Sequence, residues 1–215
     1  MNVRMPAFNR PRLVRRLAAG AAVALVLGGC SVTRPPVVKE TYLLDPAPAA
    51  AVARTQPGTL RVGVVNVAAP YRTRTFVVRE TDLKYESDFY TEFVVAPGAN
   101  IADATARSLQ RAKVFDRVLE SGAPVESDWV LDGFVPTLYA DMRNPVKPAA
   151  EIAISYYLSK ADGGSGLPFW TRDYARRVPF TGGSQAAYAA ALNTGLSEIL
   201  GELARDLSAA QLPAK

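Results

Sequence analysis

Cys30 is the only thiol in the 215-residue chain, and the chain contains no histidine. A nucleophilic catalytic centre needs a thiol or hydroxyl beside a base and an orienting group, and histidine is the side chain most often used as that base. A single cysteine also excludes a disulfide within the chain. The composition therefore disfavours a histidine-dependent hydrolase and leaves Cys30 as the residue whose chemistry needs an account.

The segment before Cys30 has the parts of a secretory leader. Five arginines precede the apolar stretch Leu17–Leu27, and Gly28 and Gly29 supply the small residues that a signal peptidase accepts. The apolar stretch has 11 residues, whereas a membrane span needs about 20. We therefore expect residues 1–29 to be a signal peptide that is removed.

The run from Leu27 through Gly28 and Gly29 to Cys30 resembles the lipobox of Gram-negative lipoproteins. That resemblance implies that Cys30 is the lipid-attachment residue, diacylated at its sulfur and acylated again at its new amino terminus. An ordinary secretory leader with an incidental cysteine is the alternative. Ser31 follows the cysteine, whereas aspartate commonly retains such lipoproteins in the inner membrane of enteric bacteria. We therefore expect an outer-membrane anchor that faces the periplasm.

Three other groups of residues could support chemistry. Ser159 and Lys160 could form a serine–lysine pair, but neighbours on a strand point to opposite faces. Residues 162–166 are rich in glycine but lack the strand-to-helix setting and the lysine of a phosphate-binding loop.

The densest acidic group consists of Asp82, Glu86, Asp88 and Glu92. Paired carboxylates can hydrolyse glycosides, but without a spacing motif this group fits a solvated face better. We therefore expect that the protein has no enzymatic activity, binds no cofactor and has no metal site.

Charge also argues against a nucleic-acid partner. Residues 1–29 hold five arginines and no acidic residue, so the remaining chain balances 20 basic residues against 20 acidic ones. The basic pI of the whole chain thus belongs to the leader. The remaining residues contain no dense lysine and arginine run that could follow a phosphate backbone.

The remaining chain divides into a linking segment and one folded domain. Ser31–Lys39 contains two prolines and no helical or strand period, which predicts a tether. Thr41–Leu44 is a short strand candidate, and Asp45–Gly58 is rich in proline and alanine, which is typical of a surface loop. We therefore expect the lipidated cysteine, tether and short first strand in 30–58, and a single domain in 59–212.

Alternating apolar residues predict most strands of the domain. The predicted strands cover residues 60–67, 75–79, 114–119, 129–141, 149–158 and 169–180. In the first of them, Leu60, Val62 and Val64 are expected to share one buried face. Pro136 lies inside a predicted strand, which favours an edge position or a bulge there. The last three strands are joined by short turns, which predicts an antiparallel meander.

Two amphipathic helices complete the predicted fold. Asn100 with Asp103 has the pattern of a helix start, and Ser184 is the expected N-cap of the last helix. The last helix carries a wide apolar stripe that suits a sheet face, with a partner-helix role as the alternative. Together the elements predict an α+β fold with a mainly antiparallel sheet and two helices on one face.

The segment 83–95 obeys neither period cleanly and is rich in aromatic residues. Tyr85, Phe89, Tyr90 and Phe93 could fill the core between a strand and the first helix. Some of them could instead be exposed as a contact patch for a partner protein or a lipid tail, because tyrosine and phenylalanine are effective interface anchors. The sequence leaves both readings open.

In its order of elements the chain resembles the ABC-type transport auxiliary lipoprotein family, which includes the lipoprotein of the paraquat-inducible intermembrane transport system. The matching blocks are Tyr42–Leu44, Leu60–Val67, Tyr71–Arg72, Phe76–Arg79, Tyr85, Tyr90, Phe93, Pro97, Leu109, Val114–Phe115, Val118, Trp129–Gly133 and Ala190–Leu207. The family often has tryptophan where this chain has Phe93. The resemblance implies that 59–212 is an ABC-transport auxiliary domain, similar in fold to the TolB amino-terminal domain.

The resemblance also implies a function. Such a lipoprotein is an outer-membrane-anchored partner of an ABC permease and ATPase and of an MCE-domain protein, which move lipid or hydrophobic solutes across the periplasm. A flat sheet edge could also pair protomers into a ring. The alternative is an envelope lipoprotein that assists assembly of outer-membrane components without an ABC partner. An anchored hydrolase is disfavoured by the missing histidine.

Overall fold

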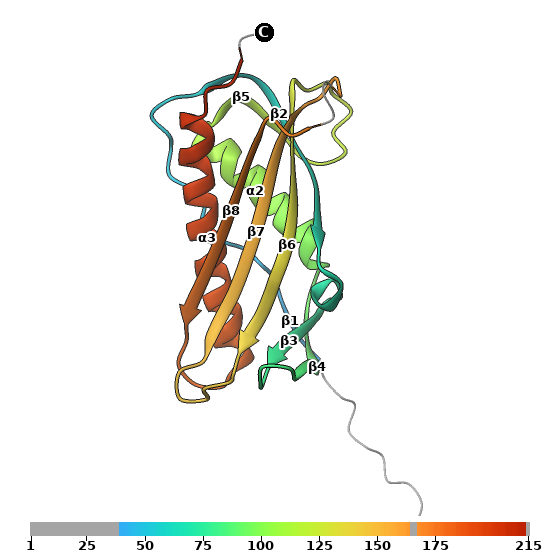
Figure 1. Ribbon diagram of the computed structural model, residues 1–215, viewed down its shortest axis with the longest axis vertical. Coiled ribbons are helices and arrows are strands. Elements are labelled where there is room, and N and C mark those ends of the chain that lie inside the picture. The colour runs from blue at the N-terminus through green and yellow to red at the C-terminus, as the bar shows by residue number, and fades with distance from the viewer. Residues whose placement is uncertain (1–38, 164–166, 214–215) are drawn as a thin grey trace, which may run out of the picture. The chain divides into compact units, whose positions relative to one another are not determined.

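A computed structural model describes residues 39–163 and 167–213 (Figure 1). Residues 1–38, which hold the predicted signal peptide, Cys30 and nearly all of the predicted tether, lie outside the described residues, so what the sequence predicts for them stays a prediction. In chain order the elements are β1 (Glu40–Tyr42), β2 (Gln56–Val67), the 3-10 helix η1 (Ala69–Tyr71), β3 (Thr75–Arg79), β4 (Tyr85–Phe93), α2 (Pro97–Ala112), β5 (Phe115–Leu119), β6 (Trp129–Asp141), β7 (Ala149–Lys160), β8 (Trp170–Pro179) and α3 (Gln185–Ala209).

Strand β6 organises the eight-stranded sheet that the described residues form. On one side it pairs antiparallel with β7, which pairs antiparallel with β8. On its other side it pairs in parallel first with β2, as far as Val67 opposite Val135, and then with β3. The sheet therefore divides beside β6 into a branch continued by β5 and a branch continued by β4 and β1. The predicted meander is confirmed. The sheet as a whole is mixed, since β2 and β3, which lie one after the other along the same side of β6, are both parallel to it.

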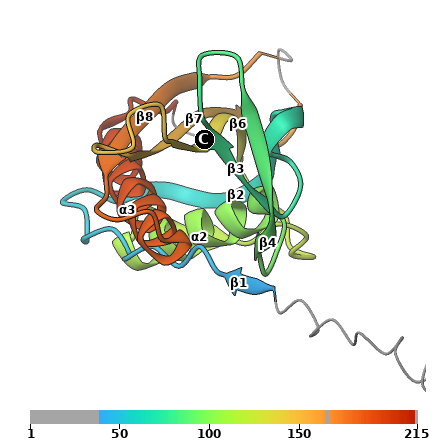
Figure 2. The ribbon, with the colours of Figure 1, turned by 90° about the horizontal axis from the view of Figure 1, so that it is seen from below.

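Both helices cover one face of this sheet (Figure 2). Helix α2 packs on β2 and β5, α3 packs on β7 and β8, and the two helices contact one another. The predicted apolar stripe of α3 is fully buried at Leu192, Leu196, Ile199 and Leu203. Ser184 is the N-cap of α3, and its Oγ accepts a hydrogen bond from the Ala187 N–H at 3.2 Å. The structure thus confirms the α+β fold with two helices on one face.

The predicted buried face of β2 is wrong at one position. Leu60 and Val62 are fully buried, but Val64 is 58% exposed and Val65 takes the buried position. The pairing of β2 with β6 shifts register between Val62 and Val65, which is a β-bulge. The bulge forms at Gly63, where a Cβ would lie 2.1 Å from the Asp132 carboxylate. An extra residue reverses the alternation, so a simple period of two cannot locate the buried side chain.

The first helix begins earlier than predicted, and Asn100 does not cap it. Ala96 is the N-cap and Pro97 occupies the first turn, which suits proline because its missing N–H would have no helical partner there. The Asn100 side chain is buried and clamps Leu44 instead. Its Oδ1 accepts from the Leu44 N–H at 3.0 Å, and its Nδ2 donates to the Leu44 carbonyl at 2.8 Å. Asn100 therefore fixes the chain that leaves β1 against α2.

Pro136 lies in a central strand and not at an edge. The sequence predicted either an edge position or a bulge for Pro136, and the bulge is present. The pairing of β6 with β7 shifts register between Phe134 and Thr137. A proline has no N–H to donate, and a bulge leaves one residue of the ladder unpaired. The bulge thus accommodates Pro136 inside the sheet.

Candidate contact surface

The four aromatic residues predicted as core or contact residues lie in three different places. Phe93 is 2% exposed, and its ring centroid is 4.5 Å from that of the fully buried Phe76. It therefore belongs to the core, and its burial removes it from the candidate contact residues. Tyr85, Phe89 and Tyr90 are 41%, 65% and 59% exposed.

Tyr85 lies at the start of β4 beside the turn from β3. Its ring meets that of Tyr139 edge to face at a centroid distance of 5.6 Å. The Arg79 guanidinium lies over both rings, at 5.4 Å from Tyr85 and 5.8 Å from Tyr139. Tyr71 packs against Tyr139 in the same group, and burial raises the pKa of its hydroxyl to about 12. Tyr85 is thus a half-exposed member of a tyrosine–arginine group.

Phe89 and Tyr90 form an exposed pair in the middle of β4. Their rings meet edge to face at a centroid distance of 5.5 Å. They lie where the pairing of β3 with β4 shifts register between Thr75 and Val77, which leaves several residues of β4 opposite Phe76 alone. The bulge therefore directs an aromatic pair outward in a strand whose end at Phe93 is buried.

This pair lies beside the first described residue. The Lys39 Nζ is 5.1 Å from the centroid of the Phe89 ring and 3.4 Å from the Glu92 carboxylate. Strand β1 then pairs in parallel with the end of β4, with Glu40 opposite Thr91. The chain that comes from Cys30 consequently joins the domain next to Phe89.

Two more exposed apolar residues lie in turns, and the sequence did not indicate either of them as a contact residue. Leu83, in the β3–β4 turn, is 95% exposed, and Val146, in the β6–β7 turn, is 85% exposed. Both turns and the start of β1 lie at the lower end of the domain in Figure 1. We call this end the β1 end and define it by Lys39, Leu83, Phe89, Tyr90 and Val146. The sequence feature that could have indicated Leu83 and Val146 is that each is a large apolar residue in a turn of mostly polar residues.

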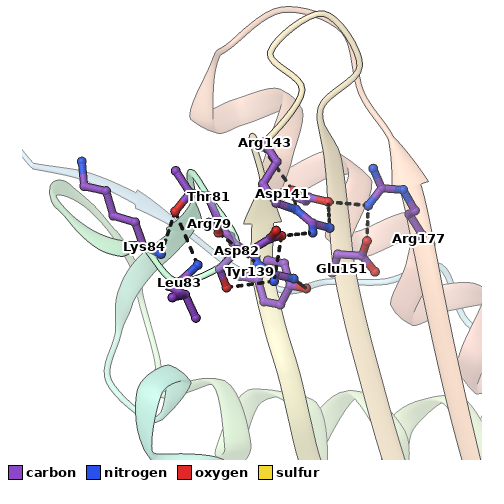
Figure 3. Close-up of polar contacts among 10 residues, drawn as sticks. All are labelled: Arg79, Thr81, Asp82, Leu83, Lys84, Tyr139, Asp141, Arg143, Glu151 and Arg177. Atoms are coloured by element: carbon purple, nitrogen blue, oxygen red, sulfur yellow. Dashed lines mark hydrogen bonds and ion pairs between the residues drawn. The ribbon is translucent and has the colours of Figure 1, made fainter.

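An ionic cluster connects the two turns (Figure 3). Asp141, at the end of β6, is 3% exposed and accepts from Arg143 Nε at 2.9 Å and from Arg177 Nη1 at 2.7 Å. Arg143, in the β6–β7 turn, also donates from Nη1 to Asp82 Oδ1 in the β3–β4 turn at 2.7 Å. Arg177, on β8, also contacts Glu151 on β7. The cluster therefore ties both turns and two strands to one buried carboxylate.

The charges of this cluster set the protonation state of its centre. The hydrogen bonds from Arg143 and, secondarily, from Arg177 hold the pKa of Asp141 well below its usual value, against the opposing effect of burial. Asp141 is thus a permanent anion at neutral pH. Figure 3 also shows Arg79 bracing the β3–β4 turn, where its Nη2 donates to the Asp82 carbonyl at 3.1 Å. The turn that carries Leu83 is held from both sides.

The acidic residues weighed for catalysis have structural partners. Asp82 pairs with Arg143, Glu86 with Lys84 at 2.7 Å, and Glu92 with Arg74 at 3.2 Å. Asp88 Oδ1 accepts from the Tyr90 N–H at 2.8 Å. Within residues 39–163 and 167–213 there is no group of three or more histidine, cysteine, aspartate or glutamate side chains placed to hold a metal. These four acidic residues therefore form ion pairs and a hydrogen bond with residues of the domain itself.

Lys160 lies at the other end of the sheet. It lines a cavity of about 220 Å³ together with Asp128, Trp129 and Asp162. Ser159, its neighbour on β7, does not line this cavity, so the structure does not bring the two together there. As for membrane crossing, no helix in the described part of the chain is long and apolar enough to span a bilayer.

Known proteins resemble the chain in fold and in sequence family. The crystal structure of protein XCC0632 from Xanthomonas campestris matches with a TM-score of 0.67 and 19% identity, over 76% of this chain and 92% of that one. The crystal structure of an uncharacterized protein matches with a TM-score of 0.62 and 14% identity, over 79% and 99%. At such identities the likeness shows the fold. No curated protein matches the chain.

The family comparison extends over most of the folded domain. The family model described as the ABC-type transport auxiliary lipoprotein component matches residues 42–204, from the last residue of β1 to within the last turns of α3. This range contains every strand pairing that divides the sheet beside β6. The chain therefore belongs to the ABC-type transport auxiliary lipoprotein family.

Proposed function

We propose that the protein is an outer-membrane-anchored scaffold of an ABC and MCE-type intermembrane transport system, and that it has no enzymatic activity of its own. The observation that carries this proposal is the family match over residues 42–204. The leader that ends at Cys30 supports it, because the family is one of lipoproteins and Cys30 supplies an acylation site. Ser31 in place of aspartate favours the outer membrane.

In this proposal each part of the chain has a mechanical role. The acyl chains on Cys30 hold the protein in one leaflet, since each buried CH₂ stabilises the bound state by about 0.8 kcal/mol. The tether sets the distance of the domain from the bilayer. The domain docks an MCE-domain protein, while the ATPase and permease of the transporter drive the movement of lipid or hydrophobic solute.

A ring of protomers is part of the same proposal. In the described chain β1, β5 and β8 are outer strands of the sheet, because each of them pairs with a single neighbour. An outer strand presents unpaired N–H and C=O groups that another copy can use. A closed ring would give the far end of a periplasm-spanning partner a symmetric seat.

The test is a crosslinking pull-down from envelope membranes with the intact lipoprotein. We expect wild type to recover an MCE-domain protein and Cys30→Ala to lose it, because the unacylated domain is no longer held at the membrane. Ser31→Ala is the matched control, since it changes the neighbouring residue and keeps the thiol. Recovery of an outer-membrane barrel, or of the lipoprotein alone, would contradict the proposal and favour the envelope-assembly function.

A further inference from the structure

The β1 end combines apolar side chains that come from three separate segments. Leu83 and Val146 project from two turns with exposures of 95% and 85%, so almost none of their surface packs on the domain. Phe89 and Tyr90 project from the bulge of β4. The ionic cluster around Asp141 fixes both turns to the sheet. The two turns therefore hold their apolar side chains in water at a fixed place on the domain.

The length of chain before β1 limits how far this end lies from a bilayer. Cys30 and Lys39 are separated by nine residues, and an extended chain of that length spans at most about 32 Å. Strand β6 alone is about 40 Å long, from its start at Trp129 to its end at Asp141. An acylated Cys30 therefore keeps Lys39, at the β1 end, within about 32 Å of the headgroups, which is less than the length of β6.

We propose that the β1 end is a second membrane contact, in which Leu83 and Val146 enter the headgroup region of the bilayer that holds the acyl chains. This inference rests on the proposed anchoring through Cys30. Phe89 and Tyr90 lie at the membrane–water boundary, where aromatic rings are enriched. Lys39 extends beside Phe89 and keeps its ammonium group in water.

The chemistry of this end fits a lipid surface better than a folded partner. Leu83 and Val146 protrude singly from two separate turns, whereas the core of a protein interface is a closely packed patch of complementary shape. A fluid lipid surface accepts separate tips in any arrangement. Two of the neighbouring cations are paired within the domain, Lys84 with Glu80 and Glu86, and Arg143 with Asp82. The contact is consequently hydrophobic and does not depend on anionic lipid.

The test uses the full acylated lipoprotein in vesicles of phosphatidylethanolamine and phosphatidylcholine. Leu83→Cys and Val146→Cys each receive an environment-sensitive fluorophore on the introduced thiol. Leu167→Cys is the matched control, because Leu167 is 74% exposed and lies in the β7–β8 turn at the opposite end. We expect the emission to shift to shorter wavelength at Leu83→Cys and Val146→Cys and to stay aqueous at Leu167→Cys. The shift should persist in about 1 M salt, where the Debye length is only about 3 Å.

The outcomes separate this inference from the proposal on which it rests. Aqueous emission at all three positions of a protein that floats with the vesicles would overturn the second contact and leave the anchor intact. A shift that requires added envelope proteins would also overturn it, in favour of a protein partner. The unmodified wild type is the control for the anchor, because an acylated Cys30 has no thiol to label. Labelling of wild type, or its failure to float, would contradict the anchoring itself.

Discussion

The Nε of Arg143 lies 2.9 Å from Oδ1 of Asp141, two residues before it in the chain, and this contact lies where β6 ends and the β6–β7 turn begins. Arg143 then reaches Asp82 across the gap to the β3–β4 turn. One buried carboxylate thus determines how two turns are placed, and those turns carry Leu83 and Val146. At this end of the sheet, beyond the apolar core, ion pairs among Asp141, Arg143 and Asp82 hold the two turns in place.

The first prediction concerns the stability that this carboxylate provides. Asp141→Asn leaves Arg143 and Arg177 without their shared counter-charge, and we expect the free energy of unfolding to fall by about 2 kcal/mol. Loss of a fully buried pair costs more, but both arginines are partly exposed and water screens them. Urea unfolding measures the change. Asp173→Asn, at an exposed position on β8, is the control and should change stability by less than about 0.5 kcal/mol.

The second prediction is the pH dependence of that contribution. The pKa of Asp141 is lower in the folded protein than its ordinary value of 3.8, so its stabilisation is fully present above that value and is lost as the pH falls below it. The difference in unfolding free energy between wild type and Asp141→Asn should be constant from about pH 7 to about pH 5 and should shrink below about pH 4. Urea unfolding at a series of pH values tests this. A difference that stays constant down to about pH 3 would show that the carboxylate is not held as an anion.

The sequence predicts best those features that a local period controls. The strands 75–79 and 129–141 agree with the structure at both ends, and the stripe of α3 is buried as expected. The role or burial of a single residue, in contrast, depends on contacts with distant parts of the chain, which a local period does not reveal. Asn100 has the spacing of a cap, but its partner Leu44 lies 56 residues away. Val64 follows the period and is exposed because a bulge reverses the alternation.

The contact surface was the least predictable part for a similar reason. Asp82, Asp141 and Arg177 come from three distant segments, and no spacing in one segment reveals that they meet. The aromatic segment 85–93 was identified as unusual, but only the bulge in β4 decides which rings face outward. The family resemblance, in contrast, depends on the order of elements and was recoverable from the sequence.

The third prediction separates the buried ring of β4 from an exposed one. Phe93→Ala should lower the free energy of unfolding by about 3 to 5 kcal/mol, because it opens a cavity beside Phe76. Phe89→Ala makes the same chemical change at a 65% exposed position and should cost less than about 0.5 kcal/mol. Thermal or urea unfolding of both variants provides the comparison. Equal costs would mean that the two rings are not in the environments described above.

The last prediction concerns the membrane in which the lipoprotein resides. Acyl chains hold a lipoprotein so firmly, at about 0.8 kcal/mol per buried CH₂, that its final membrane depends on whether it is extracted and transferred after acylation. Aspartate after the acylated cysteine commonly prevents that transfer in enteric bacteria. We therefore expect Ser31→Asp to move the protein from outer-membrane to inner-membrane fractions on a sucrose density gradient. Ser31→Asn is the control, because asparagine has nearly the same shape as aspartate but no charge, and this variant should stay with the outer membrane. Wild-type protein in the inner-membrane fraction would contradict the proposed location, and the docking partner would then have to be sought at the opposite end of the transporter.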